Sequence, residues 1–206
     1  RLLDDFRRLA YYKVNLVLLE LEDKYDYRCA PEVGVPGAYT FEQLRTLSRH
    51  AAALGIEIIP KVQCFAHVDY LLKIPRYRHL REGDHPYQYC PRNDEVFALW
   101  RAMATEVMEA LAEHRGYFHI GADEADNLGS CPRCTPYSKA DSYLFHVDRC
   151  LDFLIARGRT PIMWDDMFEY YPDALDKIPR DVIMAHWQYQ PDCYRSMSHF
   201  GNHKRE

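Results

Sequence analysis

Apolar residues recur along this chain at two spacings, that of one face of a helix and that of a buried strand. Leu2, Leu3, Phe6 and Leu9 have helical spacing, and a nearly continuous β-prone run follows at 13–20. Helix and strand then alternate along the chain. Strands are predicted at 13–20, 56–62, 117–122, 160–164 and 182–187, and helices at 40–54, 93–111, 137–157 and 173–178.

Capping residues support two of these helices. Thr40 and Gln43 form a capping-box pattern, Gly55 closes the same helix, and Asn93 is placed to cap the next one. The connection at 64–92 is long and rich in His, Tyr and Pro. Loops of this length in compact domains are usually functional or mobile, so we expect this one to lie on the substrate side.

Strands that alternate with helices, and are apolar enough to be buried on both faces, predict a parallel sheet. Polar side chains gather just after each strand, so they should meet at one edge. This is the arrangement of an α/β (β/α)8 TIM barrel, with a doubly wound sheet as the alternative, although no Gly-rich loop follows a strand. The polar sets are Glu22 with Asp23, His67 with Asp69, Asp123 with Glu124, Trp164 to Asp166, and Trp187 to Tyr189.

The central strand ends on two adjacent acids, Asp123 and Glu124. Carboxylates side by side at a partly desolvated strand end repel one another, which drives their proton affinities apart and suits a divided acid and base role. The alternative is structural, because an Asp-Glu pair after a strand often caps the next helix.

Composition limits the possible partners. The chain has 206 residues, is 48% hydrophobic and is predicted to form one domain over 1–206. Its 26 basic residues are scattered among 31 acidic ones, so we expect no nucleic-acid partner. The longest apolar runs, such as 14–19, are too short to cross a bilayer, so we expect a soluble protein with no membrane contact.

Seven cysteines, an odd number in a chain of this size, favour reduced thiols and a cytoplasmic setting. Cys131 and Cys134 have the CxxC spacing of a zinc knuckle, but this is half of a tetrahedral site. Cys29 and Cys90, on predicted substrate-side loops, are conceivable completions. Redox use and incidental thiols are the alternatives, and any zinc here would brace a loop without taking part in catalysis.

Four strand ends, in order along the chain, resemble those of glycoside hydrolase family 20, the β-N-acetylhexosaminidases, and most of all its hexosaminidase D type. The family signature His-x-Gly-x-Asp-Glu stands at 119–124, and the other matches are at 18–23, 59–67 and 163–167. The resemblance implies that Asp123 orients and polarises the 2-acetamido group of the substrate and that Glu124 is the general acid and then base. The acetamide oxygen would be the nucleophile, through an oxazolinium intermediate with retention of configuration, and no cofactor is implied.

The resemblance also implies substrate-side roles for residues at other strand ends. His67 would hydrogen-bond to these carboxylates, with Glu22 as a further partner. The alternative is that His67 is an ordinary loop histidine. Trp164 and Trp187 would enclose the acetamide methyl and the apolar face of the sugar, or pack as core. Asp165 and Glu22 would bind hydroxyls or cap helices, Tyr189 is a substitute candidate for a missing tyrosine, and His119 is interpreted as structural.

The chain departs from the family pattern in ways that limit the resemblance. Lys61 and Gln63 stand where many members have acids, and the first and last two strands of the barrel have no counterpart. The matched part corresponds to about strands 2 to 6, and five strands cannot close an eight-stranded barrel. Because the chain opens on Arg1 within a helical pattern, we expect an excerpt of a longer protein, or a barrel completed by a partner.

The resulting functional hypothesis is an exo-acting glycosidase that removes terminal β-linked N-acetylglucosamine or N-acetylgalactosamine, with a carbohydrate as its partner. The alternatives are a non-catalytic sugar-binding protein on the same fold and a zinc-dependent hydrolase built around the cysteines and histidines. A fold alone does not separate these hypotheses. The adjacent Asp123 and Glu124 favour the enzyme, because a binding protein needs no acid and base pair.

Overall fold

Five parallel strands form one sheet in the computed structural model, which describes residues 1–187. The strands lie in the order β1-β2-β3-β4-β5, so each strand pairs with its neighbours in the sequence. A doubly wound sheet would instead reverse its order at a switch point, and the structure has no such reversal over these residues. The strands are β1 (Leu16–Glu20), β2 (Glu57–Lys61), β3 (Tyr117–His119), β4 (Thr160–Trp164) and β5 (Ile183–Ala185).

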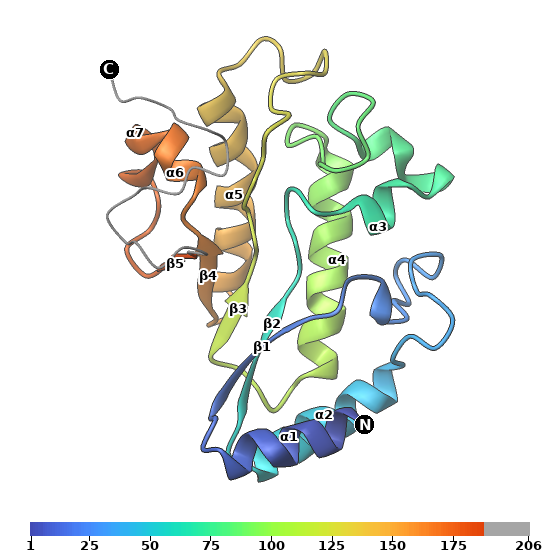
Figure 1. Cartoon of the computed structure of the whole chain (residues 1–206). Coiled ribbons are helices and arrows are strands. Elements are labelled where there is room, and N and C mark those ends of the chain that lie inside the picture. Colours follow the sequence, from blue (N-terminus) through green and yellow to red (C-terminus); the bar gives the residue numbers. More distant parts are fainter. Residues whose placement is uncertain (188–206) are drawn as a thin grey trace.

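Long helices connect the strands and cover one face of the sheet (Figure 1). The helices are α1 (Leu2–Tyr11), α2 (Phe41–Ala53), α4 (Asp94–Ala110) and α5 (Lys139–Ile155). The predicted caps are confirmed: Thr40 and Gln43 form a reciprocal capping box at α2, and the Asn93 side chain accepts a hydrogen bond from the backbone N–H of Glu95 at the start of α4.

The core lies between this helical layer and the sheet. Trp100 on α4 is fully buried, packs edge to face against Phe118 of β3 and donates its indole N–H to the carbonyl of Val62 at 3.1 Å. Residues on α5 complete the same layer, where Phe153 contacts Trp100. Side chains that alternate with Phe118 therefore point to the opposite face of the sheet.

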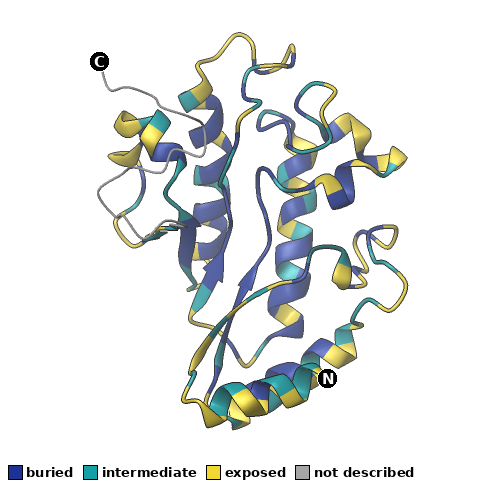
Figure 2. Ribbon diagram, viewed as in Figure 1, coloured by how far each residue is buried: buried dark blue, intermediate teal, exposed yellow. Residues whose placement is uncertain are grey.

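That opposite face is partly exposed, and the prediction of burial on both faces is wrong for the two edge strands. Leu16 and Leu18 in β1 are 46% and 42% exposed, and Ile183 in β5 is 42% exposed. Figure 2 shows the exposed stretch along β1 in yellow. The helices pack against the other face, so these apolar side chains have no covering layer within residues 1–187. In a closed barrel this face is the interior, which the opposite strands fill.

Two connections differ in detail from the prediction. The segment 64–92 contains α3 (Asp69–Leu72) and the 3-10 helix η2 (Pro75–Leu80), and its apolar side chains enter the core, so it is an ordered excursion instead of an open loop. After β4, the single helix expected at 173–178 is replaced by α6 (Met167–Tyr170) and α7 (Pro172–Leu175). A further 3-10 helix, η1 (Glu22–Lys24), follows β1. None of the helices in residues 1–187 is both long and apolar enough to cross a membrane.

Candidate active site

Asp123 and Glu124 follow β3 in a stretch that does not start a helix. The next helix, α5, begins at Lys139, and its cap is Ser138, whose hydroxyl accepts from the backbone N–H of Asp141. The helix-cap alternative for the two acids is therefore wrong. Both acids lie at the C-terminal edge of the parallel sheet, where the ends of all five strands meet.

His67, from the segment after β2, joins the two acids. Its Nε2 atom lies 3.1 Å from Asp123 Oδ2 and 3.2 Å from Glu124 Oε2. Tyr87, twenty residues further along the same segment, donates its hydroxyl to Glu124 Oε2 at 3.0 Å and packs edge to face on the imidazole of His67. We call these four residues the carboxylate cluster.

The charge of Asp123 is stabilised by its surroundings. Burial by itself would raise the pKa of Asp123, but the hydrogen bond and charge of His67, together with the charge of Lys61, outweigh it and hold the pKa below its usual range. Burial by itself would lower the pKa of His67. The two carboxylates have a larger effect in the opposite direction, so the pKa of His67 is raised. At neutral pH Asp123 is thus an ionised acceptor.

Gln63 links Asp123 to the adjacent strand. Oriented with its nitrogen toward the carboxylate, the Gln63 amide donates to Asp123 Oδ1 at 3.3 Å and accepts from Lys61 Nζ at 3.1 Å. Lys61 is also paired with Glu20 Oε2 of β1 at 3.1 Å. Gly121 makes this approach possible, because it has φ +71° and a Cβ built there would overlap the end of the Gln63 amide.

The backbone at the strand ends adopts a conformation that L-residues rarely take. Positive φ angles occur at Glu22 (44°), His67 (57°), Ala122 (69°) and Glu124 (48°), all just beyond a strand. Such residues cost about 1–3 kcal/mol each and persist where surrounding contacts hold them. One such contact is the buried Tyr143 hydroxyl, which donates to the carbonyl of Ala122 at 2.9 Å.

Asp166 extends the cluster on its β4 side. Its Oδ2 atom accepts the backbone N–H of Glu124 at 2.9 Å, and the side chain of Trp187 also hydrogen-bonds to it. Burial and the charge of Asp123 raise the pKa of Asp166, whereas the hydrogen-bond donors lower it. The net result is a pKa of about 6. Asp123 and Asp166 are thus neighbouring acids whose pKa values shift in opposite directions.

The two predicted tryptophans lie on the β4 and β5 side of the site. Trp164 packs on His119 with ring centroids 4.6 Å apart, and Lys61 Nζ lies 5.4 Å from the centre of the Trp164 ring. His119 is buried beneath, where its Nδ1 accepts the backbone N–H of Gly121, and burial lowers its pKa to about 3. His119 is thus a neutral residue that supports the turn.

Two other predicted residues, Asp165 and Glu22, lie apart from the carboxylate cluster. Asp165 faces His186, with Oδ2 2.9 Å from Nδ1. Glu22 begins η1, where burial and the charges of Glu20, Asp23 and Asp69 raise its pKa. No contact joins it to His67 among the described residues, so the structure does not support that pairing. Tyr189 lies outside the described residues.

Sequence patterns missed two members of the site. Tyr87 is one of 16 tyrosines and stands in a segment without periodicity, so nothing in the sequence distinguishes it. Asp166 is one of several polar residues after β4, and the sequence pattern does not distinguish it from Asp165, the residue predicted to bind substrate. Which of two adjacent acids turns toward Glu124 depends on the backbone beyond β4, where Asp166 has helical dihedrals at the start of α6.

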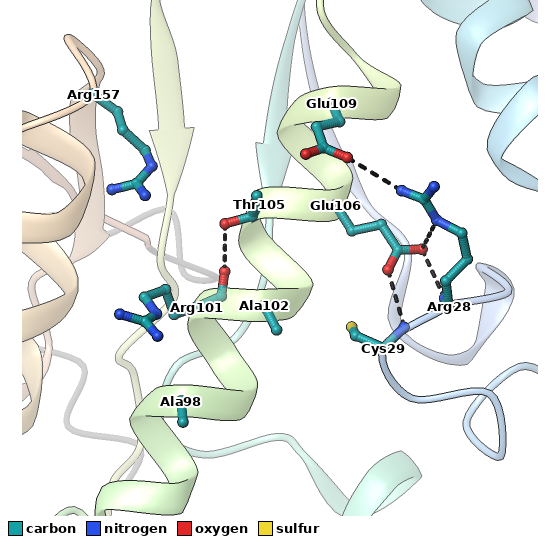
Figure 3. Close-up of a pocket in the computed structure, with 9 residues that line it drawn as sticks. All are labelled: Arg28, Cys29, Ala98, Arg101, Ala102, Thr105, Glu106, Glu109 and Arg157. Carbon is teal, nitrogen blue, oxygen red and sulfur yellow. Dashed lines mark hydrogen bonds and ion pairs between the residues drawn. The ribbon is translucent and has the colours of Figure 1, made fainter.

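The two proposed completions of the CxxC pair lie in different places. Cys90 lies beside Cys131 and Cys134. Cys29 is outside this group and lies beside α4, where its backbone N–H donates to Glu106 at 3.1 Å (Figure 3). Cys29 borders a surface cavity of about 510 Å³ that is formed by α4 and not by the strand ends. The prediction for Cys29 is therefore wrong. Partial desolvation of its thiol, together with the charge of Glu106, raises the pKa of Cys29 to about 12.

Comparison with known proteins identifies relatives that cover most of this chain. Residues 17–203 match the family model for the catalytic domain of glycosyl hydrolase family 20. The chain is 32% identical over 200 residues to hexosaminidase D of Bos taurus, which covers 91% of this chain and 57% of that protein. It is 30% identical over 202 residues to hexosaminidase D of Homo sapiens, covering 91% of this chain and 40% of that protein. The chain thus spans about half the length of these relatives.

Solved structures share the fold. A β-N-acetylhexosaminidase of Bacteroides fragilis superposes with a TM-score of 0.72 at 20% identity, covering 90% of this chain and 42% of that one. An exo-β-N-acetylglucosaminidase of Vibrio harveyi in complex with N-acetylglucosamine superposes with a TM-score of 0.74 at 19% identity. This match covers 91% of this chain and 35% of that one. Together with the family match, these likenesses confirm the predicted fold: the five-stranded sheet is part of a (β/α)8 barrel.

The close approach at Gly121 generates the first prediction. Gly121→Ala should lower the free energy of unfolding by several kcal/mol, because it adds a collision with Gln63 to the cost of a positive φ, which alone is about 1–2 kcal/mol. The matched control is Gly158→Ala, since Gly158 has φ +69° and open space around the added Cβ. Chemical denaturation of both variants measures the difference. Equal losses would mean that Gln63 moves freely and does not hold Asp123.

The raised pKa of Asp166 generates the second prediction. Its folded-state pKa of about 6 lies above its unfolded value near 3.9, so the folded protein binds this proton more tightly and gains stability from it as pH falls from about 6 to about 4. Asp166→Asn keeps an acceptor for the Glu124 N–H and removes the charge. We expect it to stabilise the fold at pH 7 by on the order of 1–3 kcal/mol, with the gain shrinking toward pH 4.

Thermal unfolding at several pH values tests this, with the exposed Asp152→Asn on α5 as the control for loss of a carboxylate. A gain in the unfolding temperature that does not change with pH, or a loss at pH 7, would contradict the assignment of the raised pKa to Asp166.

Proposed function

The chain belongs to glycosyl hydrolase family 20, and from this we propose that the protein is a β-N-acetylhexosaminidase that hydrolyses terminal β-linked N-acetylhexosaminides. The observation that carries the proposal is the position of His67 Nε2 within 3.1 Å of Asp123 and 3.2 Å of Glu124. This contact brings the two acids of the family signature to one point at the strand ends. The names of the relatives, which are hexosaminidases, support the substrate class.

Asp123 is proposed to orient the substrate 2-acetamido group. Its side chain is 13% exposed and is held by His67 and Gln63 from two directions. An ionised carboxylate fixed in this way can accept the acetamide N–H, which increases the electron density on the acetamide oxygen. It also stabilises the positive charge that develops as the oxazolinium ring forms.

Glu124 is proposed as the general acid and then base. Its side chain is 26% exposed, so it is open to a glycosidic oxygen that enters from the solvent side. Tyr87 donates to Oε2, which leaves Oε1 as the oxygen that carries the transferable proton. After the leaving group departs, the same carboxylate can take a proton from the water that opens the oxazolinium ring, which restores the acid and retains the anomeric configuration.

The remaining side chains at the strand ends are proposed to bind the sugar. Trp164, which packs on His119, and Trp187, which hydrogen-bonds to Asp166, offer flat apolar rings suited to the acetamide methyl and to the apolar face of the pyranose. Asp165 and Glu22, further out on the same edge, are proposed to accept hydroxyl donors. A barrel needs eight strands and residues 1–187 supply five, so the kinetic measurements below use the full-length protein.

Substitution of the two acids tests their separate roles. Glu124→Gln should abolish turnover of a natural disaccharide, which needs a protonated leaving group, and spare part of the turnover of an aryl glycoside with a good leaving group. Asp123→Asn should lower kcat about a hundredfold or more with both substrates, in line with lost electrostatic stabilisation of about 3 kcal/mol. Asp152→Asn is the matched control. Near-normal disaccharide hydrolysis by Glu124→Gln would remove Glu124 from the role of acid.

The substrate itself tests the mechanism. An aryl glucoside, with a 2-hydroxyl in place of the acetamide, lacks the attacking oxygen and should be almost inert, whereas the matched aryl N-acetylglucosaminide should be hydrolysed. A thiazoline mimic of the cyclised intermediate should bind far more tightly than the substrate. Comparable turnover of both glycosides, or a sugar ester trapped on Asp123, Glu124 or Asp165, would show that a protein carboxylate is the nucleophile. Binding of N-acetylglucosamine without any hydrolysis would support a sugar-binding protein instead.

A further inference from the structure

A second group of buried ionisable side chains lies between the two segments that supply the carboxylate cluster. Glu82 and Cys90 come from the segment after β2, and Cys131 and Cys134 from the segment after β3; we call these four residues the thiol cluster. One sulfur or carboxylate oxygen from each lies within 4.8 Å of all the others, and the residues are only 0% to 7% exposed.

The distances in the thiol cluster suit a tetrahedral metal ion. Cys90 Sγ lies 3.5 Å from Cys131 Sγ and 3.7 Å from Cys134 Sγ. Zinc–sulfur bonds of about 2.3 Å at tetrahedral angles place ligand sulfurs about 3.8 Å apart. Glu82 Oε2 lies 3.1 Å from Cys134 Sγ and is placed as the fourth ligand atom. The cysteines are not joined by disulfides.

Glu82 is oriented toward the thiols by the backbone. Its Oε1 atom accepts the N–H groups of Ser130 at 2.9 Å and Cys131 at 3.2 Å, which directs Oε2 to the sulfurs. These partners are neutral, although the carboxylate is completely buried. A buried charge is costly unless an opposite charge compensates it, and a divalent cation among the four ligands would do so.

We propose that Glu82, Cys90, Cys131 and Cys134 bind one structural Zn²⁺ ion. Soft thiolates select zinc over magnesium or calcium, and four protein ligands complete its tetrahedral coordination. A catalytic zinc keeps one position for water or substrate, and this buried cluster offers none. The zinc-dependent hydrolase considered from the sequence is thus not supported by these cysteines.

The bound ion would hold the two site-bearing segments together. Cys90 stands three residues after Tyr87, and Cys131 seven residues after Glu124, the two residues joined by the Tyr87 hydroxyl. Hydrogen bonds already connect the same segments, where Asn127 bonds to the side chain of Gln88 at 3.0 Å and to the carbonyl of Glu82 at 2.7 Å. Zinc would add coordination bonds from both segments to one ion, next to these hydrogen bonds.

The other cysteine and histidine group in the described residues is a poorer metal site. It consists of Cys64, His146 and Cys150. His146 Nε2 lies 2.7 Å from the carbonyl of Cys64, so this nitrogen carries a proton and donates, which prevents it from binding a metal. Only two thiols and the remaining nitrogen are left, which is too few for a structural site.

Metal analysis of the purified full-length protein tests the proposal. We expect about one zinc per chain, lost in the Cys131→Ser/Cys134→Ser double variant and retained in Cys150→Ala, the matched control in the other group. Glu82→Gln keeps the shape and the backbone acceptor of the side chain, and it should weaken zinc at least about tenfold in competition with a chelator. Cobalt substitution should give the thiolate charge-transfer and intense visible bands of a tetrahedral site.

Several results would overturn the proposal. These are wild-type protein that takes up neither zinc nor cobalt, zinc that survives the double substitution, zinc lost through Cys150→Ala alone, or a Cys131–Cys134 disulfide in the protein as isolated. If the double variant fails to fold, the cobalt spectrum of the wild-type protein and the chelator competition of Glu82→Gln still show whether these residues bind the metal. Metal content is measured without glycoside hydrolysis, so it can fail or succeed independently of the proposed function.

Discussion

A buried carboxylate at the end of β3 sets the main constraint on this structure. Asp123 is only 13% exposed, and an ionised group at such a position is stable only with charged or hydrogen-bonding partners. His67 and Gln63, both beyond β2, supply them directly, and Lys61 acts through Gln63 and through its charge. Lys61 in turn pairs with Glu20 of β1, so compensation for one acid extends across three adjacent strands.

The geometry that permits this compensation is costly for the backbone. Gly121 allows Gln63 to approach, and the turn continues through Ala122 and Glu124, which both have positive φ. His67, which contacts both acids, also has a positive φ. The packed layer of Trp100 and Phe118 behind the sheet gives the rigid base on which such strain can be maintained.

Residues of the site at this edge of the sheet are positioned partly by the strand ends and partly by the segments that follow them. The strands bring Asp123 to a fixed place, whereas Tyr87 and Glu124 depend on two long segments that lie one beside the other. Hydrogen bonds between Asn127, Gln88 and Glu82 hold these segments together, and the thiol cluster lies at the same junction. A metal here would act on the site by limiting the motion of Tyr87 relative to Glu124.

Local patterns in the sequence predicted the five strands, the long helices between them and the parallel sheet, because apolar periodicity and capping residues are read from neighbouring positions. A short signature likewise pointed to Asp123 and Glu124 as candidate acids. Only the tertiary structure selected Asp166 over Asp165, brought in Tyr87, and separated Cys29 from Cys90. Each of these depends on backbone direction beyond a strand, or on contacts between residues far apart in the sequence, such as Cys90 and Cys131, which are 41 positions apart. Local periodicity carries no information about such contacts, since they form only when separate segments pack against one another.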